Sequence, residues 1–226
     1  MDGMNPDITI EEKKGLRIDI VSDVVCPWCI IGYKQLENAL AETGIAADVH
    51  WHPFELNPRM AEEGENLRAH LAAKYGTTRE DSVKARAKLT AMGAELGFAF
   101  NYAEDMRMYN TFRAHQLLQW AGMQGRQHDL KMALFGAFFT HRKNIDDPEI
   151  LAAVAGEIGL DGDEATAVLA AGEFADAVRE EETFWMSRGI SGVPAMIFDE
   201  KYLVSGAQGV TNYTAIVSQV AEHRAA

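Results

Sequence analysis

The chain has few cysteines, and it lacks both a long apolar run and an excess of basic residues. Its 226 residues include only two cysteines, Cys26 and Cys29. A structural disulfide is rare in a reducing compartment, and a closed structural zinc site usually needs four ligands. No stretch reaches the roughly 18 consecutive apolar residues of a membrane span. The formal charge of −13 opposes binding to nucleic acid or to an anionic membrane. We therefore expect neither as a partner.

The N-terminal segment also lacks the features of a secretory signal. Met1 to Gly15 is polar and acidic, with Lys13 and Lys14, and has no basic start, apolar run or small-residue cleavage site. We therefore expect a cytoplasmic protein. The composition, 47% hydrophobic and 24% charged, is that of a globular chain with ample material for a core. The length suits either one large domain or a core with a substantial insertion.

The pattern after this segment predicts a strand, a helix and a second strand. Leu16 to Val21 begins with alternating apolar and polar residues, which is typical of a strand. Pro27 to Thr43 has helical spacing, begins with a proline suited to the first turn and is followed by Gly44. Ala47 to His52 predicts the second strand. A strand, helix and strand in this order imply a parallel crossover, with Cys26 at the helix N-terminus.

The composition changes between about residues 65 and 188. Alanine, leucine, methionine and glutamate dominate there, and β-branched runs disappear, so this stretch should be almost wholly helical. We predict helices near 65–75, 79–96, 110–123, 127–142, 147–157, 161–171 and 173–188. Beyond them, Pro194 to Phe198 and Tyr202 to Ser205 predict short strands, and Val210 to Glu222 predicts a closing helix.

The two cysteines lie in the sequence CPWC at the predicted junction of strand and helix. A Cys-x-x-Cys motif beside a β-α-β unit is typical of thioredoxin-like redox sites. The helix N-terminus favours a thiolate at Cys26, which we predict to be the nucleophile. Cys29, one turn further in and more buried, should then attack the mixed disulfide and release the partner. Pro27 fixes its own backbone and Trp28 presents a bulky ring, so neither supplies a charge.

The cysteine pair also permits a second chemistry, since two histidines could complete a zinc centre. His50 and His52 are two residues apart on the second predicted strand. We favour redox chemistry because the motif lies at a strand-to-helix junction, and isolated histidines are more often hydrogen-bonded polar residues than ligands. The prediction is therefore that the chain holds no metal.

Five sequence segments together resemble one protein family. They are DVVCPWCII (23–31), WHPFELNP (51–58), NTFRAH (110–115), GVP (192–194) and SGAQ (205–208). In this order they resemble the DsbA-like thioredoxin-fold oxidoreductases of the FrnE type, which are related to 2-hydroxychromene-2-carboxylate isomerases and kappa-class glutathione transferases. The resemblance implies an α/β protein, a thioredoxin-like fold with an inserted all-helical domain. The thioredoxin-like domain would comprise 15–60 and 189–226, and the insertion 61–188, its last helix returning to the core.

The resemblance also implies which residues surround the cysteines. It predicts a cis peptide bond between Val193 and Pro194, facing the pair, where exposed backbone would let an extended substrate pair alongside. Pro27, Trp28, Val193 and Pro194 would then contact the substrate. His115 is a further candidate, for substrate binding or proton transfer. Its place one turn after a helix-capping segment is an alternative, purely structural explanation.

Three functions fit these features. The first is thiol–disulfide exchange on protein or small-molecule thiols, with no permanently bound cofactor and with glutathione as a redox partner. The second is a glutathione-dependent isomerase or transferase, in which one residue at the helix start activates glutathione and no second cysteine is needed. The third is a non-enzymatic interaction module, which the intact cysteine pair argues against. We favour the first because only there does Cys29 have a defined use. The direction of electron flow stays open, and the related branches suggest a homodimer.

Overall fold

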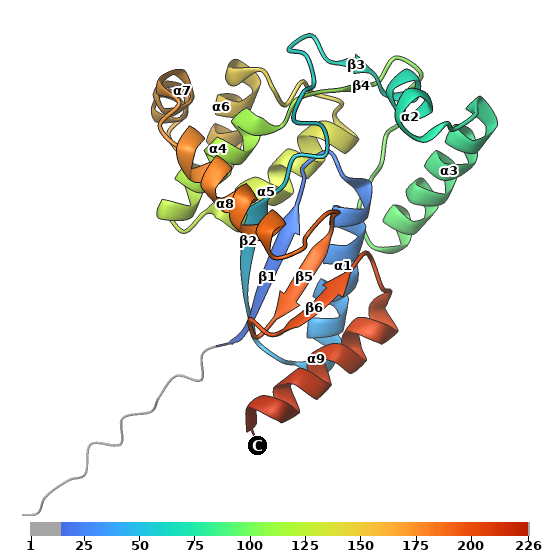
Figure 1. The fold of residues 1–226 in the computed structure, drawn as a ribbon, viewed down its shortest axis with the longest axis vertical. Helices are drawn as coiled ribbons and strands as arrows, with labels where there is room; N and C mark the ends of the chain where they lie inside the picture. Colours follow the sequence, from blue (N-terminus) through green and yellow to red (C-terminus); the bar gives the residue numbers. More distant parts are fainter. Residues whose placement is uncertain (1–14, 226) are drawn as a thin grey trace, which may run out of the picture.

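A four-stranded sheet in the order β2-β1-β5-β6 forms the centre of the fold (Figure 1). The structure is a computed structural model and describes residues 15–225. The prediction that residues 1–15 hold no secretory signal therefore concerns residues outside it, apart from Gly15. The strands are β1 (Leu16–Ser22), β2 (Ala47–Pro53), β5 (Ala195–Phe198) and β6 (Tyr202–Ser205). β1 pairs parallel with β2 and antiparallel with β5, which pairs antiparallel with β6. The predicted parallel crossover, through α1 (Pro27–Thr43), is confirmed.

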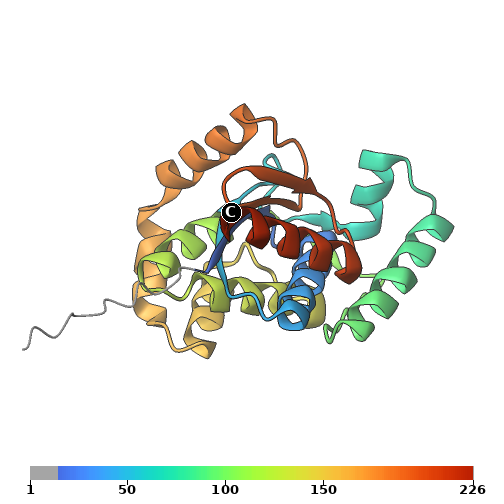
Figure 2. The same cartoon turned by 90° about the horizontal axis from the view of Figure 1, so that it is seen from below.

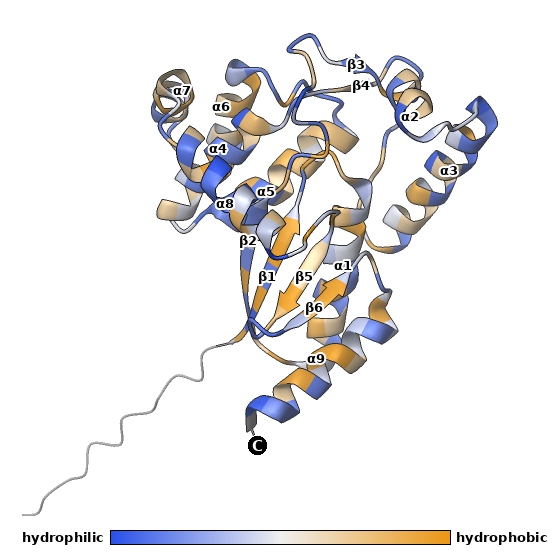
Figure 3. Cartoon of the chain, in the orientation of Figure 1, coloured by the Kyte–Doolittle hydropathy of each residue, from blue (hydrophilic) through white to orange (hydrophobic). Residues whose placement is uncertain are grey.

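The central strands are buried on both faces, which explains their apolar sequences. On one face Ile18 lies opposite Phe198, whose ring contacts Tyr213 of α9 (Val210–Ala225). α9 lies beside α1, as the view from below shows (Figure 2). On the other face Val21 packs with Ile190 in a smaller cluster. Colouring by hydropathy shows the apolar residues concentrated in β1, β5 and β6 (Figure 3).

The chain between β2 and β5 is mainly helical, as predicted. Its helices are α2 (Leu67–Tyr75), α3 (Arg79–Glu95), α4 (Phe112–Met123), α5 (Gln127–Phe135), α6 (Pro148–Glu157), α7 (Gly162–Ala171) and α8 (Ala175–Ser187). α2 and α3 lie on one side of α1, and α6 to α8 lie on the other (Figures 1 and 2). Across residues 15–225 no helix combines the length and hydropathy needed to cross a membrane. The division into two domains stays a prediction.

Two details of this helical stretch differ from the prediction. A two-stranded sheet of β3 (Glu65–Asn66) and β4 (Arg107–Met108) interrupts it. The helix predicted from residue 65 therefore begins at Leu67, because Asn66 is its N-cap and accepts a hydrogen bond from the Ala69 N–H at 3.1 Å. The helix predicted for 127–142 consists of α5 followed by a π-helical turn, η1 (Gly136–Thr140).

Candidate active site

The two cysteines lie where β1 leads into α1. Cys26 is the N-cap of α1 with an extended backbone, and Pro27 occupies the first turn, where a missing N–H loses no hydrogen bond. The Cys26 N–H donates to the Asp23 carbonyl, and the Cys29 N–H donates to the Cys26 carbonyl, both at 3.1 Å. Both residues are free thiols. Cys26 is 4% exposed and Cys29 0%, which confirms the predicted order of burial.

The loop before β5 faces the first cysteine. The Cys26 Sγ donates to the Val193 carbonyl oxygen at 3.6 Å, across 167 residues of sequence. The Val193–Pro194 peptide bond is cis, as the resemblance implies. This loop borders a groove of about 290 Å³. The groove is lined by residues 189–195 together with Leu203, Ser205 and Gly206. The structure therefore places the predicted loop against Cys26. Trp28 is 39% exposed on the adjacent first turn.

Two buried side chains, Asp23 and His115, contact each other and the backbone of residues 54–56 next to the motif. Asp23 is fully buried, and its Oδ2 accepts the Leu56 N–H at 2.8 Å. His115, 2% exposed, has its Nε2 3.2 Å from the Phe54 carbonyl oxygen and 3.5 Å from the Asp23 Oδ1. The ring thus contacts the residues that hold the motif and has almost no surface open to a substrate.

The segment before His115 shows part of the helix capping that the sequence suggested as the alternative. The Asn110 side chain accepts a hydrogen bond from the Phe112 N–H at 2.8 Å. Thr111 is the N-cap of α4, but its side chain makes no capping hydrogen bond.

The buried position of Cys29 changes the pKa of its thiol. Burial raises the pKa of the Cys29 thiol well above its ordinary value, and its hydrogen bond with Cys26 raises it further. The charge of Lys131 acts in the opposite direction and lowers the Cys29 pKa. In the folded dithiol, Cys29 therefore holds its proton tightly.

Lys131 is the residue near this site that the sequence did not reveal. It lies on α5, is 0% exposed, and its ammonium makes no hydrogen bond. Its Nζ lies 5.4 Å from the Trp51 ring centroid and 5.2 Å from that of Phe135. Burial lowers the Lys131 pKa to about 8, although Cys29, Asp23 and Cys26 raise it. In the sequence LKMALF nothing distinguishes this lysine from a solvent-exposed one.

The two histidines of the zinc alternative have other partners. The His52 Nε2 lies 2.8 Å from the Asp19 Oδ1, and its Nδ1 bonds Glu181 of α8. Burial lowers the His52 pKa, but the two hydrogen bonds outweigh this effect and leave it raised. His50 pairs with Asp48 at 2.9 Å. In the described part of the chain no three or more His, Cys, Asp and Glu residues are grouped to hold a metal ion, so the arrangement does not support the zinc alternative.

These features define a class of protein: a thioredoxin fold with a Cys-x-x-Cys dithiol at a helix N-terminus and a cis-proline loop facing it. The model of the DSBA-like thioredoxin domain family matches residues 17–217, and the chain belongs to this family. The resemblance inferred from the sequence motifs is thereby confirmed.

Solved structures agree with this assignment. The chain is similar to a probable DsbA oxidoreductase from Streptomyces coelicolor, with 34% identity and a TM-score of 0.86 over 92% of this chain and 90% of that one. The fold is shared by a 2-hydroxychromene-2-carboxylate isomerase, with 15% identity and a TM-score of 0.68 over 92% and 98%. It is also shared by the cytosolic disulfide reductase DsbM from Pseudomonas aeruginosa, solved with glutathione, with 16% identity and a TM-score of 0.62 over 92% and 100%.

Proposed function

We propose that this protein is a thiol–disulfide oxidoreductase that uses the Cys26–Cys29 pair on protein or small-molecule thiols. The observation that carries the proposal is the position of the two sulfurs. Cys26 lies at a helix N-terminus against the Val193 carbonyl, and Cys29 lies one turn deeper, buried and hydrogen-bonded to it. A first thiol at the N-terminus of the helix, with a second thiol buried more deeply behind it, suits a two-step exchange.

The exchange proceeds by two displacements at sulfur. The Cys26 thiolate attacks one sulfur of a substrate disulfide, whose S–S bond breaks, and the leaving sulfur takes the electron pair and then a solvent proton. The Cys29 thiolate next attacks the Cys26 Sγ in the mixed disulfide. The Cys26–Cys29 bond forms, the bond to the substrate breaks, and the substrate leaves as a thiolate. The substrate gains two electrons and the dithiol loses two; the reverse sequence oxidises a dithiol substrate.

The groove along the loop before β5, whose Val193 carbonyl contacts Cys26, is the proposed binding site. An extended substrate would lie along the Val193–Pro194 backbone, while Pro27 and the half-exposed Trp28 would form the other contact surface. We assign His115 to support of the motif through Asp23, because its ring is buried. Glutathione is the proposed redox partner and the cytoplasm the proposed compartment, in line with the structural similarity to a cytosolic reductase solved with glutathione. A homodimer stays a prediction.

A glutathione-dependent isomerase or transferase is the second candidate, because the fold is shared with a 2-hydroxychromene-2-carboxylate isomerase. Such an enzyme needs one activating residue at the start of α1 and no resolving thiol. The two candidates therefore differ in their dependence on Cys29. Glutathione binding with isomerase activity that survives Cys29→Ser would favour the second candidate.

The deciding measurement is the equilibrium reduction potential of the pair in glutathione buffers. The wild-type protein should show a reversible two-electron couple. Its value, compared with the potential of the surrounding glutathione pool, gives the direction of the physiological reaction. Cys29→Ser should abolish the couple and trap a mixed disulfide with glutathione at Cys26. Failure of the wild-type protein to form an intramolecular disulfide at any ratio of glutathione to its disulfide would contradict the oxidoreductase.

A further inference from the structure

Resolution of the mixed disulfide requires a Cys29 thiolate, and the structure makes this thiolate costly. Cys29 is fully buried, and burial raises its pKa well above the ordinary value. While Cys26 is bonded to the substrate, it carries no ionisable thiol and takes no proton from Cys29. The proton must therefore pass to another group in the interior beneath α1.

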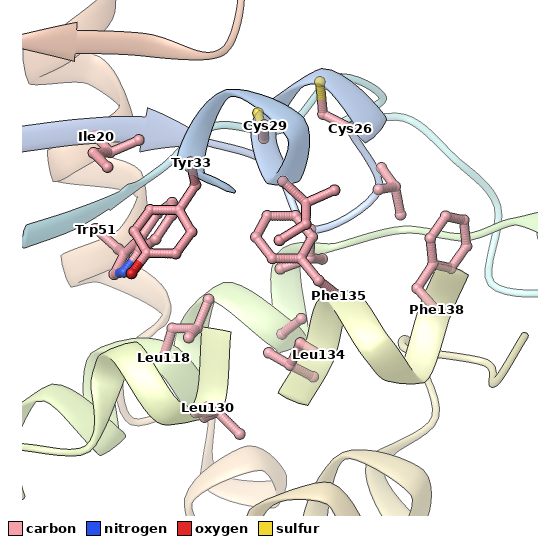
Figure 4. Close-up of a cluster of buried hydrophobic side chains, with 14 of the residues drawn as sticks. Ile20, Cys26, Cys29, Tyr33, Trp51, Leu118, Leu130, Leu134, Phe135 and Phe138 are labelled. Carbon is pink, nitrogen blue, oxygen red and sulfur yellow. The ribbon is translucent and has the colours of Figure 1, made fainter. Parts of the chain in front are cut away.

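Lys131 is placed to receive it. Its charge interacts with both cysteines and with Asp23, so its amine lies in the same buried region as the reacting sulfurs. Figure 4 shows this region: the first turn of α1, with Cys26 and Cys29, lies above Trp51 and Phe135, the two rings that flank the Lys131 ammonium. The lysine reaches this region from α5, which packs against β2.

Lys131 has the Trp51 and Phe135 rings beside its ammonium but no hydrogen-bond or ion-pair partner that would explain its burial. Its Nζ is buried and makes no hydrogen bond, although a buried ammonium is costly unless it is paired. The buried carboxylate of Asp23 does not serve as that partner, because its oxygens face the Leu56 N–H and His115. A lysine kept for stability would be paired or replaced by an apolar residue of similar size. A buried amine without a hydrogen bond, whose charge acts on two thiols, is instead suited to gaining and losing a proton.

A small cavity adjoins the amine. It has a volume of about 10 Å³ and is lined by Lys131, His52, His115, Gln119 and Gln127 among others. This volume is close to the lower limit for one water molecule. The titratable groups that face Lys131 come from the β1–α1 junction, β2 and α4, and they are Cys26, Cys29, Asp23, His52 and His115. The cavity therefore offers space beside the amine for one water molecule, through which the proton passes on.

We propose that Lys131 is the buried proton acceptor for the resolving thiol. Its neutral amine takes the proton of Cys29, and the resulting ammonium faces the Cys29 thiolate while this attacks the Cys26 Sγ. The substrate leaves with the electron pair of the broken S–S bond and takes its proton from solvent, so atoms and electrons balance. This role rests on the proposed oxidoreductase function. The lowered pKa of Lys131, about 8, leaves part of the amine neutral near pH 7, as an acceptor requires.

The test separates the two chemical steps with an aromatic disulfide, dithiobis(nitrobenzoate). Attack by Cys26 on this reagent releases one coloured thiolate, and resolution by Cys29 releases a second, so stopped-flow absorbance resolves both phases. Lys131→Met should slow the second phase by about 100-fold at pH 7 and change the first far less. The wild-type second phase should rise with pH as Lys131 loses its proton, with a midpoint below the value of about 8 of the free dithiol, because Cys26 carries no charge in the mixed disulfide. The variant should lose this rise. Lys131→Gln should behave like Lys131→Met and serves if the latter does not fold.

Lys34→Met is the matched control, since Lys34 is a partly exposed lysine of α1 that pairs with Glu37. It should leave both phases as in the wild-type protein. Two released equivalents with an unchanged second phase in the folded Lys131 variants would overturn the role of Lys131. A wild-type second phase that depends on pH in the same way as that of the variants would also overturn it. Release of only one equivalent by the wild-type protein, with no intramolecular disulfide, would instead contradict the oxidoreductase function itself.

Discussion

Lys131 occupies a position that costs the folded protein stability at neutral pH. Burial lowers its pKa from the ordinary 10.5 to about 8. At about 1.4 kcal/mol for each tenfold change in the protonation equilibrium, this corresponds to up to about 3 kcal/mol. Below pH 8 both the folded and the unfolded chain carry the charge, so the cost is complete. Between pH 8 and 10.5 the folded protein sheds the proton first, and the cost disappears.

Replacing Lys131 by Met should therefore stabilise the protein at pH 7. We expect a gain of up to about 3 kcal/mol in the free energy of unfolding, shrinking toward zero near pH 10. Urea denaturation at both pH values measures this, in a Cys26→Ser, Cys29→Ser background where no thiol titrates. Lys34→Met in the same background should change stability by less than about 1 kcal/mol at either pH. Equal destabilisation by Lys131→Met at both pH values would mean that the packing lost with the lysine stem costs more free energy than removal of the buried charge returns.

Among the secondary-structure elements, the β3–β4 pairing depends on a glycine that precedes it. Gly64 has φ +64°, and a Cβ there would overlap the Met108 carbonyl oxygen and lie 2.8 Å from the Tyr109 ring. Gly76 at the C-cap of α2 has φ +68°, but a Cβ there would meet nothing within 4 Å. The two glycines share the backbone strain of a positive φ and differ in the space around them.

We therefore expect different costs for the same substitution at the two glycines. Gly76→Ala should lower the free energy of unfolding by about 1 kcal/mol, the conformational cost alone. Gly64→Ala should lower it by about 3 kcal/mol, because overpacking adds about 1–3 kcal/mol. Thermal unfolding of the two variants measures the difference. Equal losses would show that the loop before β3 moves aside at little cost.

The elements that sequence predicts well are those with a repeating pattern. β1 alternates, α1 begins with Pro27 and ends before Gly44, and the helices of the insertion have apolar residues at helical spacing. β3 and β4 are two residues each and too short to show any period, so only tertiary pairing defines them. The burial of Lys131 cannot be predicted from the sequence for a related reason. Its burial depends on how α5 packs beneath α1, and no local pattern records that packing.

At the scale of the whole molecule, the net charge of −13 should act on every charged substrate that approaches Cys26. The groove along the loop before β5 has no charged residue in its lining, so we expect the charge of the whole molecule to dominate there. Raising the salt from about 10 mM to about 100 mM shortens the Debye length from about 30 Å to about 10 Å and screens this field.

The rate of attack by Cys26 should therefore respond to salt according to the charge of the substrate. Over this range we expect the reaction with the anionic glutathione disulfide to become about 3-fold faster and that with the cationic cystamine about 3-fold slower. The neutral hydroxyethyl disulfide should change little and serves as the control, with dithiothreitol as a protein-free reference for each reagent. Stopped-flow rates measure all of these. If both charged disulfides responded to salt as the neutral one does, charged groups beside the groove would set the electrostatic field there. Substrate choice would then depend on the local surface of the loop before β5 rather than on the net charge of the molecule.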